Sequence, residues 1–109
     1  MNPDPKVLEE MVRRIVASVQ PLAIIMFGSG ARGEMTRHSD LDLLVVMPDG
    51  CDCHIVTQTL YRRLRGLHVA KDILVVQQRD VERYGDNPYL VIHTALSQGK
   101  ELYRAGRQS

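Results

Sequence analysis

The segment AIIMFGSGARGEMTRHSDLDLLVVM, which runs from residue 23 to residue 47, decides the fold. It contains two unbroken apolar runs, residues 23–27 and 43–47, which are separated by a polar stretch rich in glycine. Short apolar runs bounded by turn residues are typical of buried strands. Asp40 and Asp42 lead into the second run, so their side chains project from the same face of the strand predicted there.

Helical and strand-like patterns alternate along the rest of the chain. Apolar residues recur at three- and four-residue steps through residues 5–19, which predicts an amphipathic helix that Pro21 ends. Residues 72–76 predict a third buried strand, and further helices are predicted over residues 53–65, 79–84 and 89–98. In the second helix, the side chains expected to face inward are Ile55, Val56, Leu60 and Leu64. This alternation predicts an α/β layer structure.

Length and composition favour one small domain over residues 1–109. The chain is 44% hydrophobic and 25% charged, and its formal net charge of +1 gives no reason to expect a nucleic-acid partner. Its apolar runs are far shorter than the roughly 20 residues that a membrane span requires. The first ten residues are charged, so we expect no secretory signal and take a reducing cytoplasm as the default location.

Three carboxylates are candidates for metal binding and catalysis. Asp40 and Asp42 lie side by side, and Asp72 enters the next predicted strand. Neighbouring carboxylates repel each other and lose hydration, a cost that a cation normally offsets. Their oxygens suit Mg²⁺ or Mn²⁺, which also take oxygens from a substrate phosphate. If the two strands are adjacent, the three acids could hold two ions for phosphoryl transfer, with Asp72 accepting a proton or holding the activating metal.

Phosphate binding is expected at the turn after the first strand. Gly28 allows the backbone to turn sharply and to approach phosphate oxygens, and Ser29 adds a hydroxyl donor. The amides of a short helix starting near Gly30 would attract anionic oxygens. Arg32 and Arg37 are both within reach in sequence, and either could contact phosphate.

Gly28-Ser29, ten intervening residues and Asp40-Leu41-Asp42 together resemble the signature of the polymerase-β-type nucleotidyltransferase superfamily in its minimal form. The surrounding segments FGSGARG (27–33), HSDLDLLVV (38–46), DILV (72–75) and GKELY (99–103) are also similar to that family. The resemblance covers most of the chain.

The resemblance implies a mixed sheet of three to five strands flanked by helices. It also implies transfer of a nucleoside monophosphate from a nucleoside triphosphate, with two Mg²⁺ ions. The phosphate role would fall to Gly28 and Ser29, and the metal role to Asp40, Asp42 and Asp72. Many relatives carry a basic residue at the position where this chain has Gly30. The basic side chain that would hold the triphosphate here therefore stays open between the two arginines of this loop, Arg32 and Arg37.

By the same resemblance, small stand-alone members are often encoded beside an all-helical HEPN protein, a ribonuclease toxin that they adenylylate. We therefore expect a type VII-like antitoxin with ATP as co-substrate, whose acceptor hydroxyl lies on a HEPN-type partner, unless a homo-oligomer supplies the acceptor site. One alternative is small-molecule adenylylation, as in aminoglycoside-modifying relatives. Another is a non-catalytic module that neutralises a partner by contact. A missing second domain should leave an exposed apolar patch on residues 5–19 or 89–98.

Other motifs in the chain receive plainer interpretations. Residues 28–33 also spell a dinucleotide-binding fingerprint, but a strand–helix–strand unit needs about 30 residues, more than residues 23–47 provide. Cys51, Cys53 and His54 are too close in sequence to converge readily on one zinc ion and are interpreted as the start of a helix. His38 is interpreted as an ordinary loop residue, and the arginines at positions 62, 63 and 65 as a solvated helix face.

Overall fold

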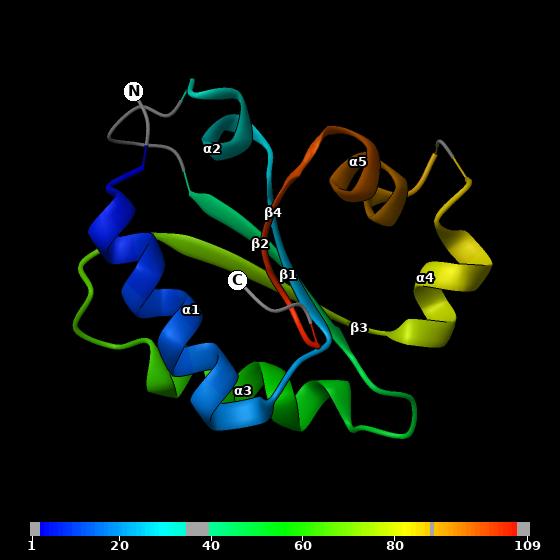
Figure 1. Ribbon diagram of the computed structural model, residues 1–109, viewed down its shortest axis with the longest axis horizontal. Coiled ribbons are helices and arrows are strands. Elements are labelled where there is room, and N and C mark those ends of the chain that lie inside the picture. The colour runs from blue at the N-terminus through cyan, green and yellow to red at the C-terminus, as the bar shows by residue number, and fades with distance from the viewer. Residues whose placement is uncertain (1–2, 35–39, 88, 107–109) are drawn as a thin grey trace.

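The structure is a computed structural model that describes residues 3–34, 40–87 and 89–106 (Figure 1). Its elements in chain order are α1 (Pro5–Val19), β1 (Ala23–Phe27), α2 (Ser29–Arg32), β2 (Leu41–Met47), α3 (Cys53–Arg63), β3 (Lys71–Gln77), α4 (Gln78–Tyr84), α5 (Val91–Gln98) and β4 (Lys100–Arg104). The strands form one sheet in the order β3-β2-β1-β4. β1 is antiparallel to β2 and β4, whereas β2 and β3 are parallel. The expected mixed sheet flanked by helices is therefore confirmed.

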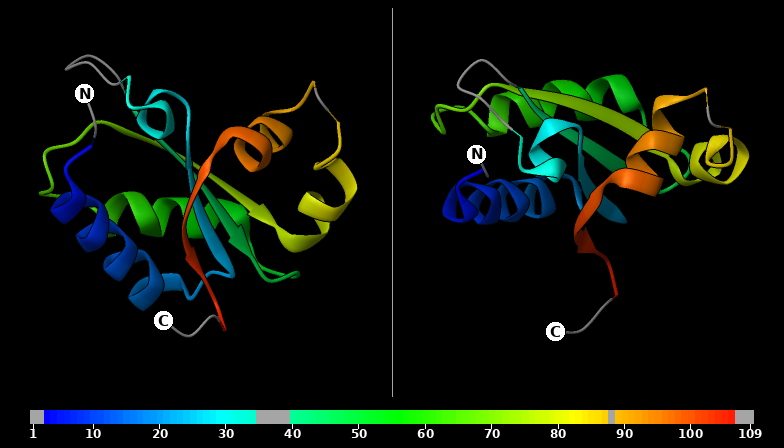
Figure 2. Two further views of the ribbon diagram at one scale, coloured as in Figure 1. Left: turned by 45° about the horizontal axis from the view of Figure 1, so that its top comes forward. Right: turned by 90° about the horizontal axis from the view of Figure 1, so that it is seen from above.

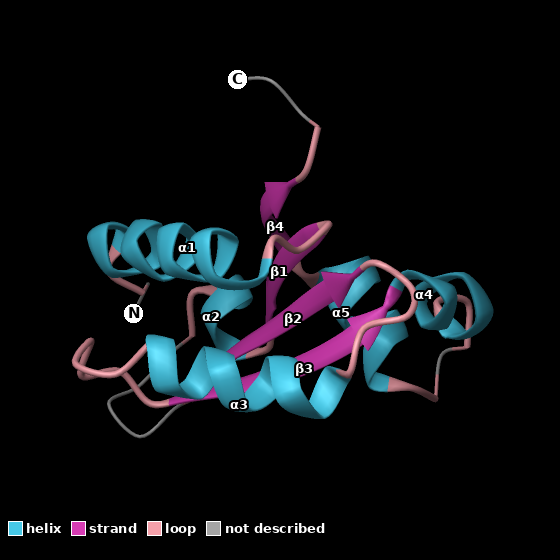
Figure 3. Cartoon of the chain, turned by 90° about the horizontal axis from the view of Figure 1, so that it is seen from below, coloured by secondary structure: helices cyan, strands magenta, loops and turns pink. Residues whose placement is uncertain are grey.

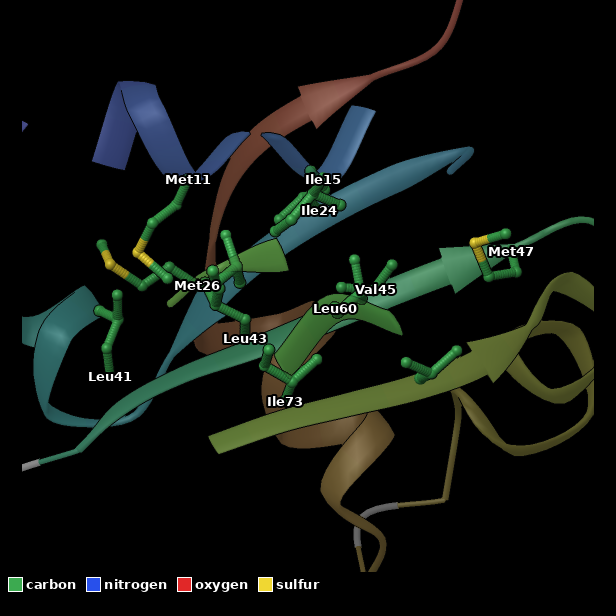
Figure 4. Packing of buried hydrophobic residues seen from close by; sticks show 12 residues of the cluster. Met11, Ile15, Ile24, Met26, Leu41, Leu43, Val45, Met47, Leu60 and Ile73 are labelled. Carbon is green, nitrogen blue, oxygen red and sulfur yellow. The ribbon is translucent and has the colours of Figure 1, made fainter. Parts of the chain in front are cut away.

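Helices cover both faces of this sheet (Figure 2). The odd-numbered residues of β2 from Leu41 to Met47 pack against α1 and α3, where Met11, Ile15, Leu60 and Leu64 are buried (Figure 4). The even-numbered residues Leu44 and Val46 pack on the other face, with Ala95 of α5. Because side chains alternate along a strand, Asp42 faces the side covered by α5.

The predicted helices and strands lie close to their expected positions. The differences concern an edge strand, the orientation of one side chain and the start of the last helix. β4 is an edge strand that the sequence patterns did not predict, since its residues KELYR lack a buried apolar run. The predicted inward orientation of Ile55 is wrong, because 58% of its surface is exposed. The last helix begins at Val91 and buries only Ala95. None of the helices in the described ranges is long and apolar enough to cross a membrane.

Candidate active site

The parallel pairing of β2 with β3 brings two of the three candidate acids together. Asp42 lies directly opposite Asp72 in the register of the two strands. Asp40 immediately precedes β2 and, by strand alternation, lies on the same face as Asp42. Asp42 is half-buried, whereas Asp40 and Asp72 are exposed. The predicted adjacency of the two acid-bearing strands is therefore confirmed.

The turn after β1 closes on the same carboxylate from the other side. Phe27, the last residue of β1, pairs with Asp42 across the antiparallel ladder. Gly28 follows with a φ of 69°, in the left-handed region that favours glycine. A Cβ atom at this position would collide with Oδ2 of Asp42. A glycine is thus required for the backbone to lie against the carboxylate, and Ser29 then begins α2.

The electrostatics of the site centre on Asp42. Burial raises the pKa of its carboxyl group, and the negative charges of Asp72 and Asp40 raise the pKa further. Arg32 opposes this shift with its positive charge. The carboxylates therefore repel each other in the free protein, and a cation placed among them would relieve that repulsion.

In the part of the chain that the structure describes, Arg32 is the basic residue closest in sequence to the Gly28 turn. Its Nε donates a hydrogen bond to Glu34 at 2.9 Å, and both side chains are about half-exposed. Gly30, at the position where many members of the resembled family carry a basic residue, is buried in α2. Arg37 and His38, which the sequence places in the same loop, lie outside the described residues.

The carboxylates of this site fit a hard divalent cation that takes its remaining ligands from a substrate. Within residues 3–34, 40–87 and 89–106, no three His, Cys, Asp or Glu side chains stand close enough to hold a metal ion by themselves. Mg²⁺ is commonly bound through one or two carboxylates, with water and substrate phosphate completing its shell. Asp42 with its charged neighbours Asp40 and Asp72 matches that kind of open site.

One residue near the acids was missed at the sequence level. The hydroxyl of Tyr61, from α3, accepts a hydrogen bond from the Ile73 amide at 3.0 Å and lies 3.5 Å from Oδ1 of Asp72. Tyr61 and Asp72 are eleven positions apart on different elements. The sequence pattern around Tyr61 indicates only a helix, so this contact required the tertiary structure.

The cysteine pair lies at the opposite end of β2 from the acids. The Sγ atoms of Cys51 and Cys53 are 3.7 Å apart, and both residues are free cysteines. Burial, together with the hydrogen bond to Cys51, raises the pKa of Cys53 to about 11. Because the thiolate is the metal ligand, a raised pKa disfavours metal binding by this thiol.

Comparison with known proteins gives one family and a consistent fold. The family model described as "Polymerase beta, Nucleotidyltransferase" matches residues 10–108. No curated protein matches the chain in sequence. A solved structure of a proposed nucleotidyltransferase from Sulfolobus solfataricus is similar, with a TM-score of 0.63 and 21% identity over 92% of this chain and 79% of that chain.

Two further similar structures come from toxin–antitoxin systems. One is a toxin–antitoxin with AMP-PNP, with a TM-score of 0.68 and 21% identity over 91% of this chain and 74% of that chain. The other is a mutant of the toxin–antitoxin MntA–HpeT in which two aspartates are replaced by glutamates. Its TM-score is 0.68 and its identity 20%, with the same coverage of 91% and 74%. At these identities, the likeness establishes the fold.

Proposed function

Because the chain belongs to the polymerase beta nucleotidyltransferase family, which its match over residues 10–108 establishes, we propose that it transfers AMP from ATP to a hydroxyl group of a partner protein. One observation carries this proposal. Asp42 pairs with Asp72 across β2 and β3 at the point where the backbone of Gly28 lies against Asp42. An acidic cluster that adjoins a glycine turn suits a metal-bound triphosphate.

The nucleotide occupies the turn between β1 and α2. The backbone at Gly28 and the hydroxyl of Ser29 contact phosphate oxygens. Arg32 leaves Glu34 and pairs with the triphosphate, an exchange that costs little because exposed ion pairs contribute only about 0–1 kcal/mol. Arginine-to-phosphate hydrogen bonds are charge-assisted on both sides, as in the ion pair that they replace, and they are frequently bidentate.

Transfer takes place beside the three acids, Asp40, Asp42 and Asp72, which would hold Mg²⁺ or Mn²⁺ together with oxygens of the substrate phosphate and water. Such ions, when bound, neutralise phosphate charge and lower the pKa of the attacking hydroxyl. The acceptor oxygen forms a bond to the α-phosphorus, the bond from that phosphorus to the bridging oxygen breaks, and pyrophosphate leaves. Asp72 is exposed at the sheet edge, where an acceptor can approach, and its carboxylate takes the hydroxyl proton.

The acceptor is proposed to be a HEPN-type toxin, with the chain acting as its antitoxin in the cytoplasm. The similarity to chains of toxin–antitoxin structures, one of them with AMP-PNP, supports this choice of partner and nucleotide. Apolar side chains exposed around α5, namely Tyr89, Leu90, Val91 and Leu96, support docking of a protein acceptor. A protein partner would bury these side chains, whereas a small-molecule acceptor would leave them in water.

Label transfer tests the proposal directly. The purified chain is incubated with ATP labelled at the α-phosphate, Mg²⁺ and the protein encoded beside it. We expect label in the partner with the wild type and none with Asp42→Asn. Label in neither reaction would contradict the transferase function, and label on an added aminoglycoside would move the acceptor to small molecules.

A cellular assay separates catalysis from contact. The double variant Asp40→Ala/Asp42→Ala is expected to lose the ability to protect cells from the partner. Continued protection by this variant, with expression equal to that of the wild type, would show that contact alone neutralises the partner.

A further inference from the structure

A side-chain hydroxyl group accepts a hydrogen bond from the outer edge of the sheet beside the acids. β3 is an edge strand, so its outward-facing backbone groups have no strand to pair with in the described sheet. The amide of Ile73 instead donates to the hydroxyl of Tyr61 at 3.0 Å. The same hydroxyl donates to Oδ1 of Asp72 at 3.5 Å. A tyrosine hydroxyl can accept and donate at once, so one oxygen links the backbone of β3 to the carboxylate.

The position of this hydroxyl is fixed by the packing of α3. Leu60 and Leu64, which flank Tyr61 in the last turn and cap of the helix, are fully buried against the sheet. α3 lies alongside β3 over its length (Figure 3). Tyr61 itself is 38% exposed, and its ring ends at the strand edge. The hydroxyl is thereby held on one side by a helix that packs on the sheet through Leu60, and on the other by a backbone amide.

Asp72 depends on such support more than Asp42 does. Asp42 sits on a central strand between β1 and β3, with Gly28 against its carboxylate. Asp72 is exposed on the edge strand, where a carboxylate can rotate about its two side-chain torsions. A hydrogen bond from an anchored hydroxyl favours one of those orientations.

We propose that Tyr61 is a positioning residue that orients the Asp72 carboxylate for metal binding and transfer, an inference that rests on the function proposed above. Partners that orient a metal ligand typically change metal affinity or activity by about 10–100-fold. The 3.5 Å separation belongs to the free protein, and hydrogen bonds of catalytic groups often shorten when substrate binds.

Binding of Mn²⁺, followed by electron paramagnetic resonance with a non-hydrolysable ATP analogue present, tests this role without an acceptor. Tyr61→Phe keeps the ring and removes the hydroxyl. We expect it to bind Mn²⁺ about 10-fold more weakly than the wild type. Tyr84→Phe is the matched control, because Tyr84 is also 38% exposed but lies in α4, after the far end of β3. The control should bind Mn²⁺ as the wild type does.

A double variant tests whether Tyr61 acts through Asp72. In an Asp72→Ala background, which removes the oxygen that accepts from Tyr61, Tyr61→Phe should cause no further loss of Mn²⁺ affinity. In the transfer assay at saturating Mg²⁺, where the weaker metal binding is overcome, Tyr61→Phe should lower kcat by about 10-fold and leave the KM for ATP unchanged. Wild-type Mn²⁺ affinity in Tyr61→Phe, or an additive loss in the double variant, would overturn the proposal.

These outcomes remain distinct from failure of the proposed function. If the wild type labels no acceptor, the transfer reaction is contradicted, whereas the Mn²⁺ measurements still decide the role of Tyr61. If label enters this chain at Tyr61 and disappears in Tyr61→Phe, the tyrosine is an acceptor, and its assignment as a positioning residue is wrong.

Discussion

At the scale of single residues, the site is built around Asp42, whose surroundings disfavour the ionised form of its carboxyl group. Asp42 is half-buried and faces two other acids, so burial and then the charges of Asp72 and Asp40 raise its pKa above the ordinary 3.8. A carboxyl group with a raised pKa in the folded state binds its proton more tightly there than in the unfolded chain. Its ionisation therefore lowers stability as pH rises through the interval between the two pKa values. A cation bound among the three carboxylates would remove this cost.

Asp42→Asn is expected to trade activity for stability. At pH 7 the variant should be more stable than the wild type and have a higher Tm, because its neutral amide is not repelled by Asp72 and Asp40. The gain should disappear below the ordinary pKa of 3.8, where the aspartate is protonated in both states. Thermal unfolding at several pH values measures this. Mg²⁺ with ATP should raise the Tm of the wild type only, and an equal Tm for both proteins at pH 7 would contradict the electrostatic argument.

Gly28→Ala is expected to damage the site and the fold together. The added Cβ meets Oδ2 of Asp42, and the φ of 69° is strained for alanine. We expect a loss of about 1–2 kcal/mol in the free energy of unfolding and a fall in kcat of about 100-fold, because the carboxylate is displaced. Gly50→Ala separates the two effects. Gly50 has a φ of 94°, but its Cβ would meet open space in the described structure, so that variant should lose stability and keep activity.

At the scale of elements, the cap of α3 illustrates how local sequence stabilises the frame. The side chain of Asp52 accepts hydrogen bonds from the amides of His54 and Ile55 at 3.0 and 3.2 Å. Asp52→Ala removes this cap and should lower the free energy of unfolding by about 1 kcal/mol. The cap lies at the end of β2 remote from Asp42, so transfer activity well below the Tm should be unchanged. Chemical denaturation and the label assay measure the two quantities, and unchanged stability would show that the cap is dispensable.

The elements also show what the sequence could predict. Strands β1, β2 and β3 were predicted because each carries a continuous apolar run, and α1 because its apolar residues repeat at helical spacing. β4 was not, because the edge strand KELYR mixes charged and half-buried residues and depends on pairing with β1. Ile55 was expected inside because it fits the helical stripe, but α3 packs through Leu60 and Leu64, further along the helix.

The residues of the candidate site also divide into those that the sequence predicts and those that only the structure identifies. Gly28, Ser29, Asp40 and Asp42 could be proposed from their residue types and from the family resemblance that their spacing carries, since they lie at the two ends of the connection between β1 and β2. The neighbour relation of Asp72 required the assumption that β3 lies beside β2, which the register now confirms. Tyr61 could not be found, because its contact with Asp72 depends on how α3 packs along the sheet.

At the scale of the whole molecule, the sheet face that bears the acids is also the face with unpartnered apolar surface. Ala95 of α5 is buried against Leu44 on this face and Val81 of α4 packs on the same cluster, which places α4 and α5 on the same side as Asp42. An exposed apolar patch was expected on residues 5–19 or 89–98, and the structure places it on the second of these. Tyr89 is 92% exposed and Val91 53% exposed. A protein bound there would lie on the side of the sheet from which Asp72 is reached.

Replacing this patch should separate partner binding from nucleotide binding. The variant Tyr89→Ser/Val91→Ser removes exposed side chains, so its stability should stay within about 0.5 kcal/mol of the wild type. Loss of a central apolar contact commonly costs about 2 kcal/mol of binding, or about 30-fold in Kd, so partner affinity should fall by at least that factor. Calorimetric titration with a non-hydrolysable ATP analogue should give the wild-type affinity. The matched control is Ile55→Ser, since Ile55 is 58% exposed but lies on α3, across the sheet. If the partner binds the patch variant as tightly as it binds the control, the acceptor docks elsewhere.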